Sequence, residues 1–253
     1  MKDWVDNDIH KVKSILGDTF FSKENILFID SEKIIKIENE IKTKLSPNEH
    51  NELIIALRKL RYKPIISLLQ SMPAHIYDLA KRLDKPLNEV EIIGGDVLID
   101  PDIYMNFFES LIHVFRNAID HGIENIQDRE SKNKDKYGTI KCKIDSDNNL
   151  ISICISDDGR GLNEQALVKV ALEKSIITKN EVASLTQDKI FEFIFNENFS
   201  TKNQVSELSG RGFGLTAVSH ELAKLKGKII IKSKLDVGTE IVFTLPYTPI
   251  EQI

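Results

Sequence analysis

The feature of this sequence that most limits its fold is a pair of strand-turn-strand patterns with helical patterns between them. Residues 139–144 and 150–155 alternate apolar and polar side chains around a polar turn, which predicts one β-hairpin. Residues 228–234 and 239–245 predict a second hairpin, turned through Asp236-Val-Gly238. Helical patterns at about 163–173, 179–195 and 213–226 lie between the two hairpins. Helices gathered on an antiparallel-rich sheet make a two-layer α/β sandwich, an α/β fold class.

The N-terminal quarter predicts a helical hairpin. Residues 1–29 have weak periodicity and read as a linker or an irregular segment, whereas apolar residues recur at helical spacing from Ser31. Ser46-Pro47-Asn48-Glu49 predicts a stop followed by a new helix start, and Pro64 predicts a break after the second helix. We therefore expect a hairpin over 30–63 and a catalytic domain over 64–248.

Such a hairpin cannot bury both of its apolar stripes alone. Pairing with a second copy in a four-helix arrangement is a frequent solution, so residues 30–63 predict a homodimer. Packing of the hairpin against its own globular domain is the alternative.

The middle of the chain predicts further helices. One is expected over 65–83, a strand over 90–93 before Gly94-Gly95, and a long helix from Pro101 to His121. The charged, aromatic-poor segment 127–137 predicts an exposed loop or a short helix.

Composition excludes several classes of protein. The net charge of −5 over 253 residues argues against a nucleic-acid binder. No apolar run is long enough to predict a membrane span, and no secretory signal pattern opens the chain. Cys142 and Cys154 form no CxxC pair, so neither a zinc site nor a disulfide framework is indicated, and a reduced cytoplasmic setting fits best.

The helix that ends near His121 carries a polar stripe. Glu109, His113, Asn117 and His121 are four residues apart, so a regular helix would align them, with Arg116 and Asp120 at the flanks. An asparagine amide oxygen is a hard ligand that suits Mg²⁺, and Mg²⁺ in turn prefers phosphate oxygens and water. An ordinary solvated helix face is the alternative for a lone His/Asn pair.

Two glycine-rich segments follow this helix in the sequence. Asp157-Asp-Gly-Arg-Gly161 comes directly after a strand, where a carboxylate can accept a hydrogen bond from an exocyclic amine while the glycines let a ring approach the backbone. Gly210-Arg-Gly-Phe-Gly214 opens a helix, where free backbone N–H groups favour polyphosphate. Gly238-Thr239 adds a further position of close approach.

Together these segments resemble the N, G1, F, G2 and G3 boxes of the Bergerat-fold (GHKL) ATPases. The segments are His113-Val-Phe-Arg-Asn-Ala-Ile-Asp-His-Gly122, Asp157-Asp-Gly-Arg-Gly-Leu162, Phe199-Ser-Thr-Lys202, Ser209-Gly-Arg-Gly-Phe-Gly-Leu215 and Gly238-Thr239. The N box and the stretch from Phe199 to Gly214 are most similar to the chemotaxis-type histidine kinases, the CheA family. Leu60-Arg-Tyr-Lys-Pro-Ile-Ile-Ser67 resembles that family's junction between dimerisation helices and ATPase domain, so the resemblance covers about residues 50–248.

The resemblance implies the ATP-binding core of a protein histidine kinase that works in two-component signalling. It implies that Asp157 recognises the adenine amine, that Asn117 binds Mg²⁺, and that His113 and Arg116 serve catalysis beside the γ-phosphate. Further nucleotide-facing residues implied are Asp120, His121, Gly159, Gly161, Ser200, Thr201, Gly210, Gly212, Gly214, Leu215 and Thr239. The stretch from Phe199 to Ser209 would be a lid over the phosphates.

The chain departs from the family pattern in its histidines. Kinases of this family phosphorylate a histidine on a helical phosphotransfer domain, and none of the six histidines here has that setting. Ser219-His220-Glu221-Leu222 is similar to the acceptor motif of other sensor kinases, but it falls inside the ATPase domain and reads as a decoy. We therefore expect the acceptor on a phosphotransfer domain outside this chain, with a response regulator downstream, and the chain to be the core of a longer kinase.

Two other functions remain open. A plain ATPase of the gyrase or mismatch-repair type would share the boxes, but it would normally carry a glutamate where this chain has His113. A catalytically weak GHKL ATPase or a dimeric pseudokinase scaffold would keep the fold and lose boxes.

Overall fold

The computed structural model describes residues 31–44, 47–147, 149–196, 199 and 214–249, and no side chain is described for residues 31 and 47–52. The chain divides into two compact units that meet between Leu60 and Arg61. None of the helices in these ranges is both long and apolar enough to cross a bilayer.

The first unit is a hairpin of α2 (Ser31–Lys44) and α3 (Pro47–Arg61). Ile34 on α2 and Ile54 on α3 are buried, and the Arg58 guanidinium pairs with the Glu38 carboxylate at 3.4 Å across the two helices. Among the side chains of this unit that the structure describes, Ile35, Ile37, Leu53 and Leu60 are large, apolar and exposed. The predicted hairpin is therefore present, with apolar surface left uncovered.

The second unit is built on a five-stranded sheet in the order β2-β4-β5-β7-β6. The strands are β2 (Glu91–Gly94), β4 (Ile140–Asp147), β5 (Leu150–Asp157), β6 (Lys228–Lys234) and β7 (Gly238–Pro246). β2 runs parallel to β4, and every other neighbouring pair in this sheet is antiparallel. A short ladder joins β1 (Lys63–Pro64) to β3 (Leu98–Ile99).

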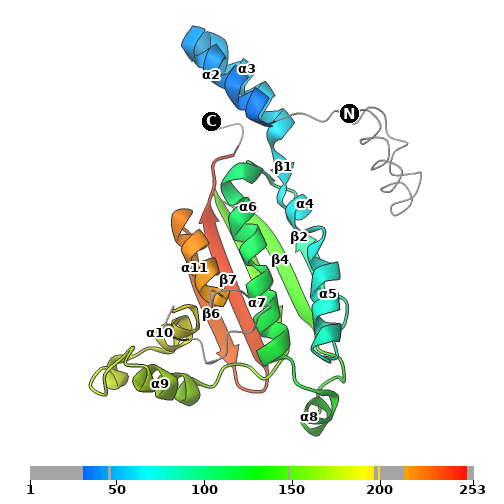
Figure 1. Ribbon diagram of the computed structural model, residues 1–253, viewed down its shortest axis with the longest axis vertical. Coiled ribbons are helices and arrows are strands. Elements are labelled where there is room, and N and C mark those ends of the chain that lie inside the picture. The colour runs from blue at the N-terminus through cyan, green and yellow to red at the C-terminus, as the bar shows by residue number, and fades with distance from the viewer. Residues whose placement is uncertain (1–30, 45–46, 148, 197–198, 200–213, 250–253) are drawn as a thin grey trace, which may run out of the picture. The chain divides into compact units, whose positions relative to one another are not determined.

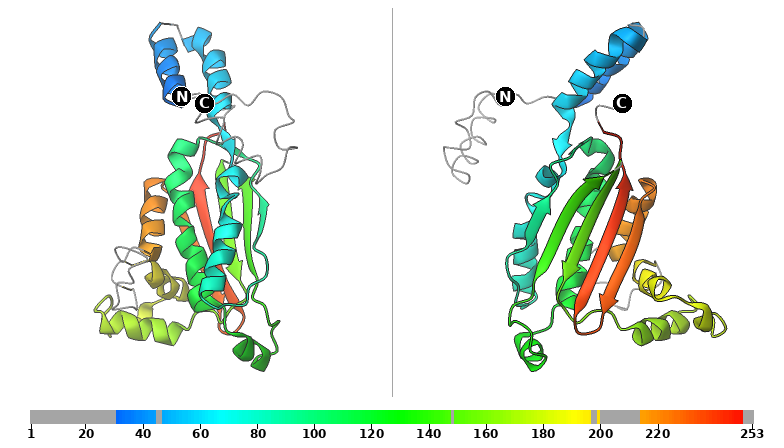
Figure 2. Two further views of the ribbon diagram at one scale, coloured as in Figure 1. Left: turned by 45° about the vertical axis from the view of Figure 1, so that its right-hand side comes forward. Right: turned by 180° about the vertical axis from the view of Figure 1, so that it is seen from behind.

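The main helices cover one face of this sheet, as Figures 1 and 2 show. They are α5 (Met72–Arg82), α6 (Pro101–Ser110), α7 (Ile112–Asn117) and α11 (Gly214–Lys224), preceded by the short α4 (Ile65–Leu69). Along β4, buried Ile140, Cys142 and Ile144 alternate with exposed Lys141 and Lys143, so one face of the strand meets the helices and the other meets solvent. The predicted two-layer α/β sandwich is confirmed.

The remaining helices lie around the ends of the strands. They are α8 (Ile126–Ser131), α9 (Glu164–Glu173), α10 (Gln187–Glu192), the 3₁₀ turns η3 (Val182–Ser184) and η4 (Phe193–Phe195), and the π-helical turn η2 (Ala118–Gly122). Aromatic rings fill the core between the layers: Phe107 packs edge-on against Phe108 and Phe243, with ring centroids 5.7 and 5.6 Å apart.

Three helix predictions were wrong in length. The helix expected over 65–83 is divided into α4 and α5, because Pro73 in the first turn of α5 has no N–H to continue the preceding helix. The helix expected over 179–195 is broken into η3, α10 and η4, and α10 starts at a Thr186 cap whose hydroxyl accepts from the Lys189 N–H. The long helix expected from Pro101 to His121 is interrupted at Leu111 and changes its pitch after Asn117.

The aromatic cluster gives a test of the core. Phe107→Ala should lower the free energy of unfolding by about 3–5 kcal/mol, because it leaves a cavity facing Phe108 and Phe243. Ile103→Ala on the same helix, where the side chain is 56% exposed, should change it by less than about 0.5 kcal/mol. Urea unfolding of both variants measures the difference, and equal losses would contradict the assigned packing.

Candidate functional site

The helix that carries the predicted N box ends in a π-helical turn. Ile123 N–H donates to the Ala118 carbonyl at 2.7 Å, a bond that spans five residues instead of four. The wider turn leaves the Gly122 carbonyl free to accept from Arg160 N–H at 2.9 Å. π-helical turns of this kind are frequent at functional sites. Here the turn connects the end of the N-box helix to the loop after β5 through the hydrogen bond between Gly122 and Arg160.

This turn corrects the expected alignment of the polar stripe. Glu109 lies in α6, His113 and Asn117 in α7, and His121 in η2, so the four do not follow one regular helix. The change in pitch turns His121 out of line, and its side chain is exposed with Nε2 3.6 Å from the Asp120 carboxylate. His113 and Asn117 remain one α-helical turn apart, and both are half-buried.

His113 is held neutral at physiological pH. Burial lowers the pKa of the imidazole, and the nearby Arg116 guanidinium lowers it further. Arg116 is itself half-buried one residue before Asn117. A neutral imidazole and a permanent positive charge thus lie close together on α7.

Asp157 ends β5 and lies against two glycines. Its Oδ1 accepts from Gly159 N–H at 2.9 Å, and a Cβ added to Gly122 would lie 3.2 Å from the same oxygen. Burial raises the pKa of this carboxyl to about 6, and the Asp158 charge raises it as well, while hydrogen bonds from the Gly159 and Thr239 backbones and the charge of Lys134 oppose the rise. The carboxylate is therefore desolvated yet still ionised at neutral pH.

Close approach of backbones explains the glycines around Asp157. A Cβ on Gly159 would lie 2.4 Å from the Gly122 carbonyl group, and one on Gly238 would lie 2.0 Å from the Asp157 carbonyl oxygen. Gly161 has φ +68°, and a Cβ there would lie 2.2 Å from the Lys234 carbonyl oxygen. Only glycine fits these three positions without movement of the backbone.

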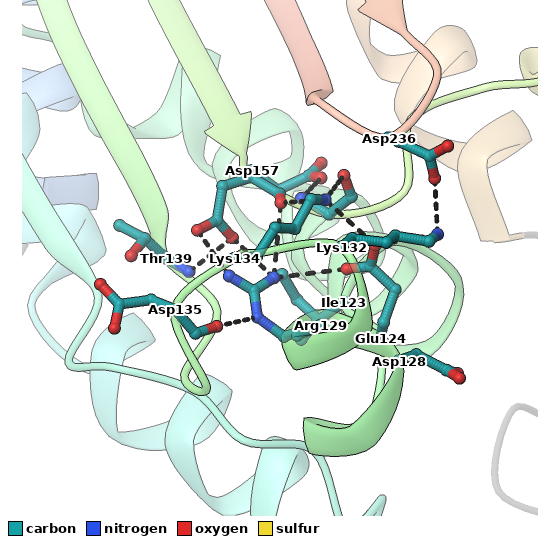
Figure 3. Close-up of polar contacts among 12 residues, drawn as sticks. Ile123, Glu124, Asp128, Arg129, Lys132, Lys134, Asp135, Thr139, Asp157 and Asp236 are labelled. Carbon is teal, nitrogen blue, oxygen red and sulfur yellow. Dashed lines mark hydrogen bonds and ion pairs between the residues drawn. The ribbon is translucent and has the colours of Figure 1, made fainter.

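An ionic cluster centred on the buried Arg129 supports this loop. We define it as Glu124, Arg129, Lys134 and Asp158, and Figure 3 shows how Glu124 and Lys134 lie around Arg129. Arg129 has no exposed surface; its guanidinium donates to the Asp158 carboxylate at 2.8 Å and to Glu124 Oε2 at 3.3 Å, with further bonds to the backbone carbonyls of Asp135 and Tyr137. Asp158 Oδ1 also accepts from Thr139 N–H at 2.9 Å.

Lys134 completes the cluster. Its ammonium group donates to Glu124 Oε1 at 3.0 Å and to the Asp158 and Gly159 carbonyls at 2.8 and 2.6 Å. Burial alone would raise the pKa of Glu124, but the Lys134 hydrogen bond, a backbone hydrogen bond and the charges of Lys134 and Arg129 bring it below its ordinary value. Glu124 is thus a buried carboxylate that stays ionised.

The sequence interpretation missed this cluster and Gly122. The segment 127–137 does contain a short helix, α8, but the prediction of an exposed segment was wrong for Arg129. The many charged residues of this segment predicted exposure to solvent. A charged side chain can still be buried when its ion-pair partner lies far away in the sequence, and the sequence alone does not identify that partner. Gly122 stood within the recognised N box, so its place there was the available signal.

The other predicted residues fall in different settings. Thr239 lies opposite Asp157 in the β5–β7 ladder, and its hydroxyl is 3.0 Å from Ser233 Oγ. Gly214 opens α11, and no atom of the described residues lies within 4 Å of a Cβ built there, whereas Leu215 is buried in the core. Ser200, Thr201, Gly210 and Gly212, together with most of the predicted lid, lie outside the described residues. The nucleotide roles of all these residues stay predictions.

Comparison with known proteins gives the family. Residues 108–249 match the model of the histidine kinase-, DNA gyrase B- and HSP90-like ATPases, a range that includes α7, the whole loop after β5 and the β6–β7 hairpin. The chain belongs to this ATPase family. The sandwich fold and the ATP-binding core predicted from the sequence are thereby confirmed.

Within that family, the chain is similar to chemotaxis kinases. It is 32% identical to the sensor histidine kinase CheAY of Helicobacter pylori over 93% of this chain and 30% of that protein. It is 34% identical to the chemotaxis protein CheA of Listeria monocytogenes over 78% of this chain and 32% of that protein, and 33% identical to CheA of Bacillus subtilis over 88% and 34%. The chain thus spans about a third of the length of these relatives. The expected resemblance to the CheA family is confirmed.

The buried Asp157 carboxylate predicts an unusual pH dependence of stability. A carboxyl whose pKa rises from 3.8 to about 6 on folding stabilises the fold below pH 3.8, and this contribution is lost as the pH rises through 6. An asparagine amide carries no charge, so Asp157→Asn avoids the cost of burying an ionised carboxylate. The variant should therefore be more stable than the wild type at neutral pH by about 1–3 kcal/mol.

Urea unfolding across this pH range measures the effect. Asp158→Asn is the matched control with the opposite sign, because it removes the carboxylate that pairs with the buried Arg129 and should destabilise the fold. A destabilised Asp157→Asn variant at neutral pH would contradict the expected desolvation of Asp157.

Proposed function

We propose that this chain is the ATP-dependent phosphotransferase core of a CheA-like histidine kinase, which transfers the γ-phosphoryl group of ATP to a histidine on a phosphotransfer domain. The observation that carries the proposal is the buried, ionised Asp157 with Gly122 and Gly159 against it. A desolvated carboxylate needs a donor, and an adenine amine supplies one where the absence of side chains lets a flat ring approach.

Asn117 is the proposed Mg²⁺ ligand. The described residues contain no group of three or more His, Cys, Asp or Glu side chains arranged to hold a metal. A single half-buried amide oxygen instead suits an ion that takes most of its ligands from phosphates and water. When bound, Mg²⁺ would neutralise charge on the polyphosphate.

His113 and Arg116 are the proposed catalytic residues. Phosphoryl transfer depends on positioning and on charge stabilisation more than on covalent chemistry of the protein. A neutral His113 imidazole can orient a γ-phosphoryl oxygen by a hydrogen bond, and Arg116 can offset its charge. Since an imidazole stands where related ATPases normally have a glutamate base, water activation is disfavoured and transfer is favoured. Asp120 and His121 are proposed to lie beside the nucleotide.

The acceptor histidine is proposed to lie on a separate phosphotransfer domain, from which a response regulator would receive the phosphoryl group. His220 is a poor candidate, because it lies on α11 within the ATPase domain, where its exposed ring is 3.7 Å from Glu221. The names of the relatives, which are chemotaxis and sensor kinases, support this role in two-component signalling. The proposed setting is the cytoplasm, where ATP is present and the free thiols of Cys142 and Cys154 remain reduced.

The kinase proposal is tested by incubating the chain with radiolabelled ATP, Mg²⁺ and the phosphotransfer domain of a CheA relative. The acceptor should gain a phosphohistidine, which is stable in base and labile in acid. Asn117→Asp and Asp157→Asn should each reduce transfer by about 100-fold or more while the fold survives. The first variant alters the proposed Mg²⁺ ligand, and the second alters the proposed adenine-binding carboxylate.

The control for this assay is His220→Gln, which should transfer at the wild-type rate. Full activity in Asn117→Asp or Asp157→Asn would refute the site assignment. ATP binding without transfer to any acceptor would favour the scaffold alternative, and steady phosphate release without an acceptor would favour a weak ATPase.

We further propose that residues 30–63 form a homodimer interface. The hairpin exposes Ile35, Ile37 and Leu53, and among the described residues Glu38 Oε1 is buried without a hydrogen-bond partner. A second hairpin would cover the apolar side chains and could supply a donor to Glu38.

Sedimentation equilibrium should give about twice the 28.8 kDa mass of one chain. Leu53→Glu should raise the dimer dissociation constant by about 100-fold, because it buries a charge in an apolar interface. Ile103→Glu places the same charge on an exposed position of α6 and should leave the dimer intact. A monomeric wild-type chain at high micromolar concentration would rule the interface out.

A further inference from the structure

Lys134 contacts the loop after β5 without taking part in the proposed chemistry. It follows α8, its side chain is 13% exposed, and its ammonium group points at the two carbonyl groups of Asp158 and Gly159 (Figure 3). A lysine ammonium has three donors, and the third is used on Glu124. Every donor of this side chain is therefore committed to holding a fixed position.

The two carbonyl groups belong to consecutive peptide planes. In a trans peptide the C=O and the following N–H point in opposite directions, so a contact on one side sets the direction of the group on the other. With the Asp158 carbonyl turned to Lys134, the Gly159 N–H is directed at Asp157 Oδ1, 2.9 Å away. With the Gly159 carbonyl turned to Lys134, the Arg160 N–H is directed at the Gly122 carbonyl, also 2.9 Å away.

Those two N–H groups hold the two sides of the proposed adenine pocket. One fixes the carboxylate of Asp157, and the other fixes Gly122 at the end of η2. Glycine offers no side chain to restrict its own backbone, so the Gly159 peptides need an outside anchor. Lys134 supplies that anchor.

The position of Lys134 is itself determined by buried groups. Its backbone N–H donates to the Arg129 carbonyl at 3.0 Å, and its ammonium pairs with Glu124, which is buried beside the Arg129 guanidinium. Lys134 is thus part of the ionic cluster around Arg129 and has little freedom to move.

We propose that Lys134 is a positioning residue for adenine recognition, which orients the Asp158-Gly159-Arg160 backbone so that the Asp157 carboxylate is presented to the base. The proposal rests on the assignment of Asp157 to adenine made above. Lys134 acts through Asp157 and touches no nucleotide.

The charge of Lys134 has a second effect on Asp157. Burial raises the pKa of Asp157 to about 6 and Asp158 adds to the rise, whereas Lys134 and the Gly159 and Thr239 N–H groups restrain it. Removal of the Lys134 charge should therefore raise the pKa of Asp157 further. The pH midpoint below which ATP binding is lost should therefore also be higher than in the wild type.

The test compares ATP and GTP binding to the full 253-residue chain by calorimetric titration with Mg²⁺ present. Lys134→Met should weaken ATP binding by about tenfold, because a misdirected Asp157 loses a charge-assisted hydrogen bond. Binding of GTP, which has a carbonyl where adenine has its amine, should fall much less. Lys136→Met is the matched control, since its ammonium is exposed near the Tyr137 ring in the same segment, and it should bind ATP as the wild type does.

A double-mutant cycle separates positioning from general destabilisation. If Lys134 acts through Asp157, Lys134→Met combined with Asp157→Asn should bind ATP no more weakly than Asp157→Asn alone. The pH midpoint of ATP binding should rise in Lys134→Met and also in Lys134→Gln, which retains a neutral donor. If Lys134→Met does not fold, the same measurements are made on Lys134→Gln.

The outcomes distinguish this inference from the function on which it rests. Unchanged ATP affinity in Asp157→Asn would refute the adenine assignment. Weaker ATP binding in Asp157→Asn, together with wild-type affinity and pH midpoint in the Lys134 variants, would overturn the role of Lys134 alone. Additive losses in the double variant, or equal losses for ATP and GTP, would also overturn it.

Discussion

The contact between the Arg129 guanidinium and the Asp158 carboxylate is the interaction on which the geometry of the site depends. Arg129 is fully buried, and a buried charge is tolerated only where it is paired and its donors are used. Its bonds reach Glu124 after η2, the Asp135 and Tyr137 carbonyls after α8, and Asp158 after β5. One side chain thus holds three chain segments, and loss of a single partner costs about 3–5 kcal/mol in such a setting.

This arrangement gives two adjacent carboxylates different surroundings. Asp157 and Asp158 are adjacent, yet Asp158 pairs with cations while Asp157 meets backbone N–H groups and glycines. Asp158 therefore serves the structure, whereas its neighbour Asp157 is desolvated and accepts hydrogen bonds from backbone N–H groups, with no paired cation among the residues that the structure describes. The contrast explains why two acidic residues stand together at the end of β5, where electrostatic repulsion alone would disfavour them.

The sequence predicted most of the sheet and only part of the site. Strands β4 and β5 were predictable because alternation along Ile140–Ile144 and Ile151–Ile155 follows from burial of one face. The breaks at Pro73 and at the π-helical turn were missed. The spacing of apolar residues stays close to helical at such points and does not show that the backbone hydrogen-bond pattern changes. Arg129 and Lys134 were missed because their partners, Glu124 and Asp158, are set by tertiary contacts. Asp157 was singled out by its place at the end of a strand, two residues before Gly159, and its role stays a prediction.

The β6–β7 turn closes against the loop after β5, with Asp236 N–H donating to the Arg160 carbonyl at 2.7 Å and Gly238 close to the Asp157 carbonyl. The residues close to Asp157 therefore come from positions near 122, 157 and 238, which are brought together only when β7 inserts between β5 and β6. Contacts of such long sequence separation form late and slowly in folding. No partly assembled sheet can bring these residues together, so a nucleotide that binds beside Asp157 should stabilise the whole second unit as one cooperative body instead of a single loop.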